Sequence, residues 1–386
     1  MFRRTEESKF TSWYFEIDKM LLWLVLGMIF VAMIIAISSG SAMFVRTMNM
    51  THKIQWYEFF VRMIPFYVVG IATMLGVSMA GRNTIIKLSW ADLIVCFLLL
   101  LGTVVNPHIM NSSHRWFVLP GLPRIMPSDL MKPGFVIITA WFICKMKSIY
   151  GSGLFDLKRT LFQLKTWSWG WYLIPFAVVL GIQFWHPDFG TMVLYLLTFG
   201  VMLLLAGLPM RWVWILGGAG CGVGLLGLMV LPHVRARTLA LFGAVDPTSQ
   251  IGTALRAVRN GGLFGAGDKA SVVEHLPMAE SDFVLSVISE NFGAIIACVL
   301  IVLLAMVVIH LINQSRCMRD DFSSMAITGT AAMFGFQCCI NLASTLRLMP
   351  AKGMTLPFIS HGGSSLIAYC LLFGMVLALM REDKWQ

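Results

Sequence analysis

Asp282 is the residue whose type and position are best suited to chemistry. It lies in HLPMAESDFVLSVISENFG, where a polar segment passes into an apolar run, so its carboxylate meets both water and a low dielectric. A general base at a membrane surface needs this placement, because a polar substrate can reach it and neighbours can tune its pKa. A carboxylate that only caps a helix would occupy the same position. Glu290 lies eight residues further on, about two helical turns, which places it on the same side at greater depth.

Other ionisable residues lie at or within apolar runs, where a charge is costly and is usually kept for function or for pairing with another charge. They are Asp129, Lys132, Asp188, Arg62 and Arg347. A snorkelling charge or a buried structural pair is the alternative interpretation for each of them. For Arg62 we favour the structural role.

The segment NGGLFGAG at residues 260 to 267 concentrates glycine next to two arginines. It does not match a phosphate-binding loop, because no predicted strand precedes it and no lysine occupies the required position. A tight re-entrant turn is the better prediction. Arg256 and Arg259 are three residues apart on a short amphipathic helix, where one face can contact phosphate or simply be solvated. His233 and His275 lack a second ligand at metal-binding spacing, so no zinc site is predicted.

The elements that position these residues are apolar. The chain is 58% hydrophobic and only 12% charged, with a mean hydropathy of +0.78, which is typical of a protein that is solvated by lipid. Its net charge of +10 comes from Lys and Arg spread over short connecting segments, which indicates membrane topology and not nucleic-acid binding. Most of the cysteines lie in apolar runs, so no disulfide is expected.

Ten apolar runs are predicted to form helices, near residues 20 to 40, 59 to 80, 90 to 106, 134 to 150, 169 to 185, 190 to 208, 212 to 232, 283 to 312, 325 to 346 and 364 to 380.

The sequence thus predicts an all-α integral membrane protein with about ten transmembrane helices. Short segments on one side carry more Lys and Arg once the long segment 233 to 282 is set aside, which places both ends in the cytoplasm. That long segment becomes a large outer loop between the seventh and eighth helices. We expect three regions: a cytoplasmic N-terminal segment 1–19, a membrane domain 20–381 and a cytoplasmic tail 382–386.

From about residue 60 to 380 the chain resembles the SEDS family of cell-wall polymerases (shape, elongation, division and sporulation), and five segments carry this resemblance most strongly. In chain order they are RWFVLPGLPRIMPSDLMKP at 115 to 133, HPDFGTMVL at 186 to 194, RNGGLFGAG at 259 to 267, LPMAESDFVLSVISENFG at 276 to 293 and MPAKGMTLPFISHGGSS at 349 to 365. Each is weak alone, but five in the family's order are specific. The stretches DPTSQIGTALRAVRNGGLFG and LMPAKGMTLPFIS are closer to the division branch than to the elongation branch.

This resemblance implies a peptidoglycan glycosyltransferase. It would polymerise lipid II into glycan strands at the outer face of a bacterial cytoplasmic membrane, at the division septum. The expected partners are a class B penicillin-binding protein, which is a transpeptidase, and other membrane proteins of the division machinery. The family's essential aspartate falls on Asp282, which is therefore predicted to be the base that deprotonates the attacking sugar hydroxyl.

Nine further residues are predicted to bind the substrate or its pyrophosphate, since developing negative charge in a partly dry site favours fixed cations. They are Lys132, Asp129, Arg115, Arg256, Arg259, Asp188, Glu290, Arg347 and Lys352. A divalent cation is a further candidate for stabilising the pyrophosphate. The chain departs from the family pattern at Met278, Glu280 and Ser281, which replace an acidic residue, a histidine and a threonine, and at His361, which replaces a tyrosine.

Two other functions would use the same residues. A lipid II flippase or other transporter would bind the lipid without reacting with it. A scaffold would only recruit and activate a penicillin-binding protein, and the departures around Asp282 favour it slightly. Substitution of Asp282 distinguishes the three, because only a polymerase should tolerate neither Asn nor Ala there.

Overall fold

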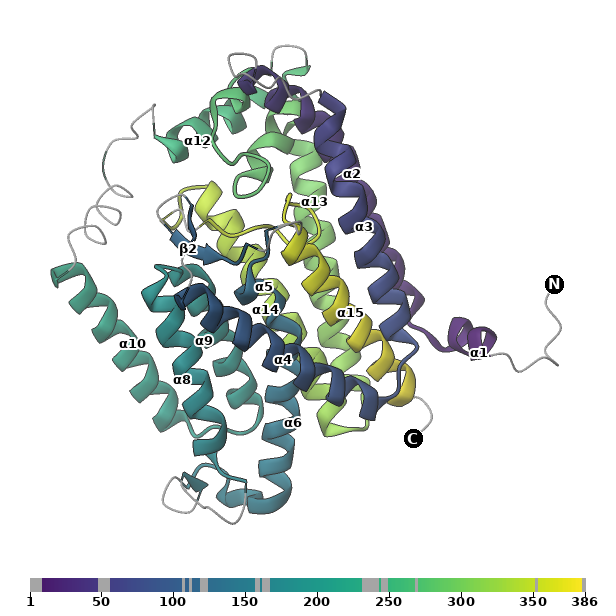
Figure 1. Ribbon diagram of the computed structural model, residues 1–386, viewed down its shortest axis with the longest axis vertical. Coiled ribbons are helices and arrows are strands. Elements are labelled where there is room, and N and C mark those ends of the chain that lie inside the picture. Colours follow the sequence, from purple (N-terminus) through teal and green to yellow (C-terminus); the bar gives the residue numbers. More distant parts are fainter. Residues whose placement is uncertain are drawn as a thin grey trace.

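The computed structural model describes residues 9–47, 56–105, 108–110, 113–118, 124–156, 160–161, 167–230, 243, 249–267, 270–350 and 353–383. Ten long helices in these ranges overlap the ten predicted apolar runs. They are α2 (Lys19–Thr47), α3 (Trp56–Ser78), α4 (Arg82–Val105), α6 (Lys132–Tyr150), α8 (Trp169–Trp185), α9 (Phe189–Leu205), α10 (Met210–Val230), α13 (Val284–Cys317), α14 (Asp321–Thr345) and α15 (Gly363–Asp383). Figure 1 shows them as one helical body with α10 at its edge.

Six of these helices are long and apolar enough to cross a membrane: α2, α3, α4, α13, α14 and α15. Two more, α8 and α9, are apolar but shorter. Helices suit this environment because every backbone N–H and C=O is paired within the segment, and lipid offers no replacement partner. The chain is therefore a multi-pass helical membrane protein.

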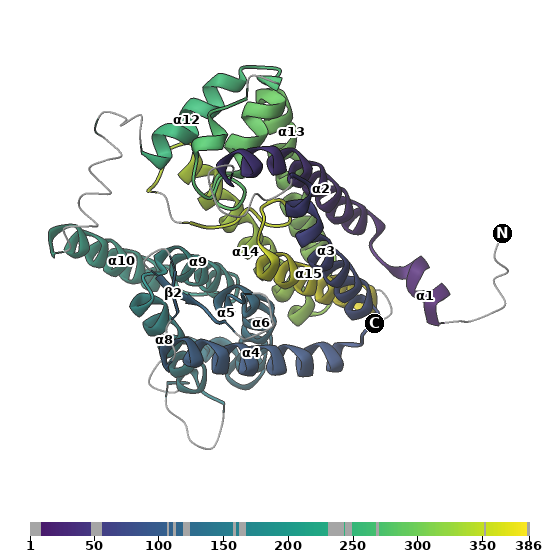
Figure 2. The same cartoon turned by 45° about the horizontal axis from the view of Figure 1, so that its top comes forward.

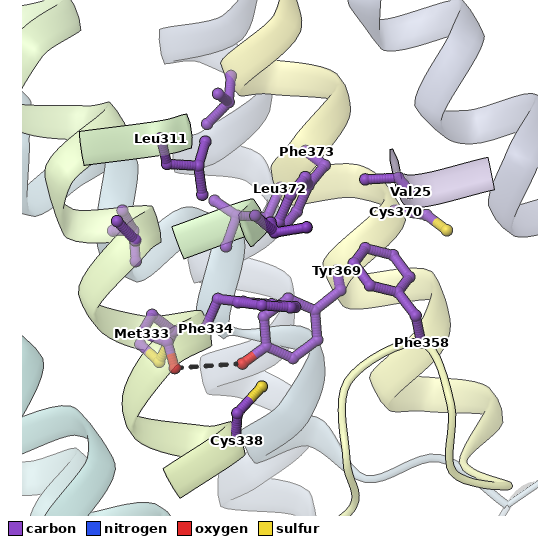
Figure 3. Close-up of a cluster of buried hydrophobic side chains, with 14 of the residues drawn as sticks. Val25, Leu311, Met333, Phe334, Cys338, Phe358, Tyr369, Cys370, Leu372 and Phe373 are labelled. Carbon is purple, nitrogen blue, oxygen red and sulfur yellow. Dashed lines mark hydrogen bonds between the residues drawn. The ribbon is translucent and has the colours of Figure 1, made fainter. Parts of the chain in front are cut away.

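The core centres on α14, which packs against α6, α9, α13 and α15. Phe334 of α14 meets the rings of Tyr369 and Phe373 from α15 edge-on, with ring centroids 5.9 and 5.5 Å apart. Phe358, from the loop before α15, completes the aromatic cluster (Figure 3). Because side chains from three segments interdigitate here, the cluster fixes how α15 and its preceding loop sit on α14.

A break in α13 gives the glycine-rich segment its place. Gly293 has φ +89°, outside helical geometry, so α13 consists of two helices joined at this residue. The turn after α12 (Gln250–Gly261) packs into the break, with Ala294 N–H donating to Gly262 O at 2.9 Å and Ala266 N–H to Glu290 O at 2.7 Å. A Cβ on Gly261 would lie 1.8 Å from Ser289 O, so only glycine allows this approach. The predicted tight turn is confirmed, and α12 is the predicted helix carrying Arg256 and Arg259.

The segment between α4 and α6 contains a small element that the all-α prediction missed. Strands β1 (His108–Met110) and β2 (Ser113–Trp116) pair antiparallel, and a short helix, α5 (Pro127–Leu130), follows. A two-stranded hairpin this short gives little hydrophobic pattern, so apolar runs alone do not reveal it. It carries Arg115 into the site described below.

The first and last described helices both bond to the junction between α3 and α4, at the opposite end of the bundle from α12. Trp13, in the short helix α1 (Lys9–Glu16), donates its indole N–H to Ser78 Oγ at 2.9 Å. Arg82 N–H donates to Glu382 Oε2 at 2.7 Å, close to the end of α15. Figures 1 and 2 show α1 projecting from the side of the bundle where α15 ends.

Candidate active site

Asp282 lies in the turn that leads into α13. Its N–H donates to Met278 O at 3.0 Å, and Phe283, not Asp282, is the N-cap residue of α13, without a side-chain capping bond. Asp282 therefore does not act as a capping carboxylate. Burial raises the pKa of Asp282, and the charges of Glu280 and Asp129 raise it further, while the Ser281 hydroxyl and Arg115 lower it. A carboxylate in this setting is a stronger base than one in water, which suits proton abstraction.

Arg115 is the cation that faces Asp282. Its Nη1 lies 3.4 Å from Asp188 Oδ1, which ties the guanidinium of β2 to the start of α9. A Cβ on Gly353 would lie 3.2 Å from Asp282 Oδ2 and 3.7 Å from Arg115 Nη2, so both groups converge on the space that this glycine leaves open. Asp188 is 2% exposed, and its Oδ2 has no hydrogen-bond partner among the described residues. Asp188 thus holds Arg115 in position.

Lys132 and Asp129 form a buried ion pair. Lys132 Nζ donates to Asp129 Oδ1 and to Gln337 Oε1, each at 2.6 Å, and its side chain is 1% exposed. Tyr369 donates its hydroxyl to the same Gln337 oxygen at 2.6 Å. Because a buried cation needs an opposite charge and hydrogen-bond acceptors, these two bonds explain why Lys132 is held inside the protein. Its ammonium does not reach the surface in this structure.

Two amides of α14 connect this network to the loops. Gln337 Nε2 donates to Thr355 O at 2.8 Å, and Asn341 Nδ2 donates to Met354 O at 2.6 Å and to Asp282 O at 3.0 Å. Both amides are buried, at 1% and 0% exposure. Loop 353–362 and the Asp282 turn are therefore fixed to the same helix. This sets the spacing between Gly353 and Asp282.

Glu290 is bonded to several groups within the protein. Its carboxylate accepts hydrogen bonds from the N–H groups of Ser271, Val272 and Val273, at 2.7 to 3.1 Å, and from Asn260 Nδ2 at 2.7 Å. It is fully buried. Because protein donors occupy both carboxylate oxygens, Glu290 positions the segment after α12.

The other predicted binding residues are more dispersed. Arg256 and Arg259 are exposed on α12, which packs against α13. Arg347 donates from Nη2 to Gly243 O at 2.6 Å and has φ +60°, a strained backbone for a side-chain-bearing residue. Lys352 lies outside the described residues. In the described part of the chain no three His, Cys, Asp or Glu residues gather as a metal site, so a divalent cation stays a prediction.

Sequence reasoning missed Gln337, Asn341 and Tyr369. Gln337 and Asn341 are polar residues four apart within the apolar run 325 to 346, which places them on one face of a helix. Buried amides in a membrane helix usually hydrogen-bond to other segments, so this spacing was the available signal.

The fold and the site define a polytopic helical membrane protein in which a carboxylate and a guanidinium converge at one end of the bundle. The family model described as cell cycle protein, covering proteins of the FtsW, RodA and SpoVE type, matches residues 19–385. The chain belongs to this family, which is the SEDS family that its motifs predicted.

Curated relatives extend over nearly the whole chain. A protein named probable peptidoglycan glycosyltransferase FtsW from Caulobacter vibrioides is 32% identical over 387 residues, covering 99% of this chain and 93% of the relative. A protein with the same name from Legionella pneumophila is 28% identical and covers 96% of this chain and 92% of the relative.

Solved structures share the fold. A chain of a peptidoglycan synthase complex superposes with a TM-score of 0.73 at 23% identity, covering 96% of this chain and 99% of that one. The rod shape determining protein RodA of Thermus thermophilus gives a TM-score of 0.65 at 24% identity, covering 96% and 98%. At these identities the likeness shows a common architecture only.

Proposed function

We propose that this protein is a peptidoglycan glycosyltransferase that polymerises lipid II, with Asp282 as its catalytic base. The convergence of Asp282 and Arg115 on the space beside Gly353 is the observation that carries this proposal. Its relatives named peptidoglycan glycosyltransferase FtsW support the same activity. The reaction needs one base and one cation close together, and this pair supplies them.

In the proposed reaction the 4-hydroxyl of one lipid-linked disaccharide attacks the anomeric carbon of another. Asp282 takes the hydroxyl proton as the new C–O bond forms. The bond from the anomeric carbon to the pyrophosphate oxygen breaks with inversion, and its electron pair leaves with the lipid pyrophosphate. Arg115 stabilises that developing negative charge, because a fixed cation in a partly dry site needs no reorganisation.

The environment of Asp282 fits a base of this kind. Burial and the charge of Glu280 raise its pKa, which strengthens its hold on the proton, while Arg115 opposes them and favours the ionised form. Arg256, Arg259 and Lys352 are proposed to contact the pyrophosphate or the lipid headgroup through their positive charges. The Asp129–Lys132 pair and Asp188 are proposed to support the site from within the protein.

We assign the ten long helices to ten crossings, with both ends in the cytoplasm and residues 231 to 283 on the outer face. The bonds of α1 and of the end of α15 to the same junction between α3 and α4 support placing both ends on one side. Residues 20–381 are then one membrane domain in a bacterial cytoplasmic membrane, at the division septum. Reporter fusions after residues 18 and 383 and within 233–248 test this topology. An outer-face signal from either end would contradict it.

A membrane-spanning helix of a class B penicillin-binding protein is the proposed partner, docked on α13. Exposed apolar residues follow one face of α13 at alternating spacings of four and three: Ile295, Val299, Val302, Met306 and Ile309. This is the repeat with which one helix packs against another. A charged residue at Val302 should dissociate the partner, and the same change at the exposed Val178 of α8 is the matched control.

The decisive experiment supplies lipid II to the purified protein with its penicillin-binding partner and separates glycan products on a gel. We expect polymer from the wild type and from His275→Gln, an exposed control on the same segment, and none from Asp282→Asn. Polymer from Asp282→Asn would refute the role of Asp282. Lipid II translocation without polymer would support a flippase, and stimulation of the partner alone would support a scaffold.

A further inference from the structure

Helix α1 presents three different faces around its eight residues. At about 100° per residue, Tyr14 lies between Phe10 and Phe15 on an arc of about 140°, Trp13 borders that arc next to Phe10, and Ser12 and Glu16 lie about 160° from Tyr14 on the opposite side. Trp13 is buried at 6% exposure, whereas Phe10, Tyr14 and Phe15 are 62, 49 and 66% exposed. Three aromatic rings on one open face of a short helix need a partner that is not in the structure.

The orientation of α1 is fixed by the bundle. Its Trp13 indole is bonded to Ser78 at the end of α3. Asp18, two residues after the helix, accepts hydrogen bonds from Leu21 N–H at 2.7 Å, from His310 Nε2 at 3.0 Å and from Gln314 Nε2 at 3.0 Å. Because α2, α3 and α13 all hold this junction, the aromatic face of α1 points in a set direction.

That face continues the surface of a membrane-spanning helix. Along α2, whose residues 19–37 form a candidate span, Met20, Trp23 and Phe30 are 50, 67 and 64% exposed. The surface that α2 offers to lipid therefore extends onto α1. Lys19 lies at the bend, with Nζ 5.1 Å from the Tyr14 ring centroid and 5.5 Å from that of Phe15. Aromatic rings beside a lysine are typical of the headgroup region of a bilayer.

We propose that α1 lies in the plane of the membrane surface, with Phe10, Tyr14 and Phe15 buried among lipid headgroups and acyl chains. Its occupant is lipid, because the aromatic face is continuous with the exposed surface of α2. Figures 1 and 2 both show α1 leaving the bundle sideways, as an in-plane helix must. Through Asp18, this anchor also fixes the end of α13 that is farthest from Asp282.

The test places one nitroxide label at a time on the full-length protein, in lipid nanodiscs that hold a single copy. The native eight cysteines are replaced first, and the starting variant must keep its thermal unfolding temperature. Labels at Phe10→Cys and Phe15→Cys report on the aromatic face, and labels at Ser12→Cys and Glu16→Cys are matched controls on the polar face. Relaxation by oxygen, which concentrates in lipid, is compared with relaxation by a water-soluble nickel chelate.

For each label, accessibility to oxygen is divided by accessibility to the nickel chelate. If the aromatic face is buried in lipid, this ratio should be at least about fivefold higher at positions 10 and 15 than at 12 and 16. High nickel accessibility at all four positions would show α1 in water and overturn the proposal. Low accessibility to both reagents at positions 10 and 15 would show burial against protein, and would overturn it equally. The result does not depend on the activity proposed for Asp282.

Discussion

The side-chain amide of Asn341 donates to the backbone carbonyl of Asp282 at 3.0 Å, and the same nitrogen donates to Met354 O at 2.6 Å. One buried amide thus joins two loops that are far apart in sequence. Its own Oδ1 has no hydrogen-bond partner among the described residues. Leaving a buried oxygen without a partner costs free energy, so the two hydrogen bonds made by the nitrogen must stabilise the fold by more than this cost.

Replacing Asn341 with leucine should slow glycan polymerisation by about a hundredfold, because a displacement of about 1 Å in a reacting group has that effect. Leucine keeps the volume but leaves both carbonyls without a donor. The rate with saturating lipid II is the measurement. Thr330→Val, a buried isosteric change elsewhere on α14, should stay close to wild type. Unchanged turnover in Asn341→Leu would show that this bridge does not position Asp282.

Replacing Lys132 with methionine should destabilise the protein by about 3–5 kcal/mol, because it leaves the Asp129 carboxylate buried without its partner. Thermal unfolding in detergent measures this. The double variant Asp129→Asn with Lys132→Met removes both charges and should recover much of the stability. If the double variant is no more stable than Lys132→Met alone, the two charges do not form the pair seen in the structure.

Activity should be lost at a pH above the usual pKa range of a carboxylate, because Asp282 must be ionised to act and burial raises its pKa. This loss is the acid limb of the pH–activity profile. Activity is then lost as the pH falls through that raised pKa. Glu280→Gln removes a negative charge that raises the pKa, so the limb should move to lower pH. Arg115→Gln removes a positive charge that lowers it, so the limb should move to higher pH. Shifts in the same direction would contradict this arrangement.

Replacing Glu290 with glutamine should cost about 3 kcal/mol of stability, because an amide nitrogen would meet backbone N–H groups that now bond to a carboxylate. Limited proteolysis should show faster cleavage within residues 260–275. Glu274→Gln, a half-buried change in the same segment, is the control. Equal cleavage of both variants and the wild type would show that Glu290 does not position this segment.

His361 should make the protein less stable in acid. Burial lowers its pKa to about 4, against 6.5 for a free histidine, so the unfolded chain takes up the proton first. Stability therefore falls as the pH drops from about 6.5 towards 4. The unfolding temperature of His361→Gln should fall less over this range. An identical acid dependence in both proteins would show that His361 does not contribute.

Composition and motifs alone predicted the class of protein and singled out Asp282 as its candidate base. Each of the ten apolar runs overlaps a long helix, because a run of apolar side chains long enough for a lipid-exposed helix can be recognised from the local sequence. Asp282 was identifiable because a carboxylate at the junction of a polar segment and an apolar run is rare and costly. Its position in the turn before α13 matches that expectation.

Only the tertiary structure decided the partners of each charge. Lys132 bonds to Gln337, 205 residues away, and Asp18 bonds to Gln314, 296 residues away. No local pattern encodes such pairs, because they depend on how helices pack against one another. The same reason explains Glu290, which was expected near Asp282 but reaches the segment after α12 through the packing of that segment into the break at Gly293.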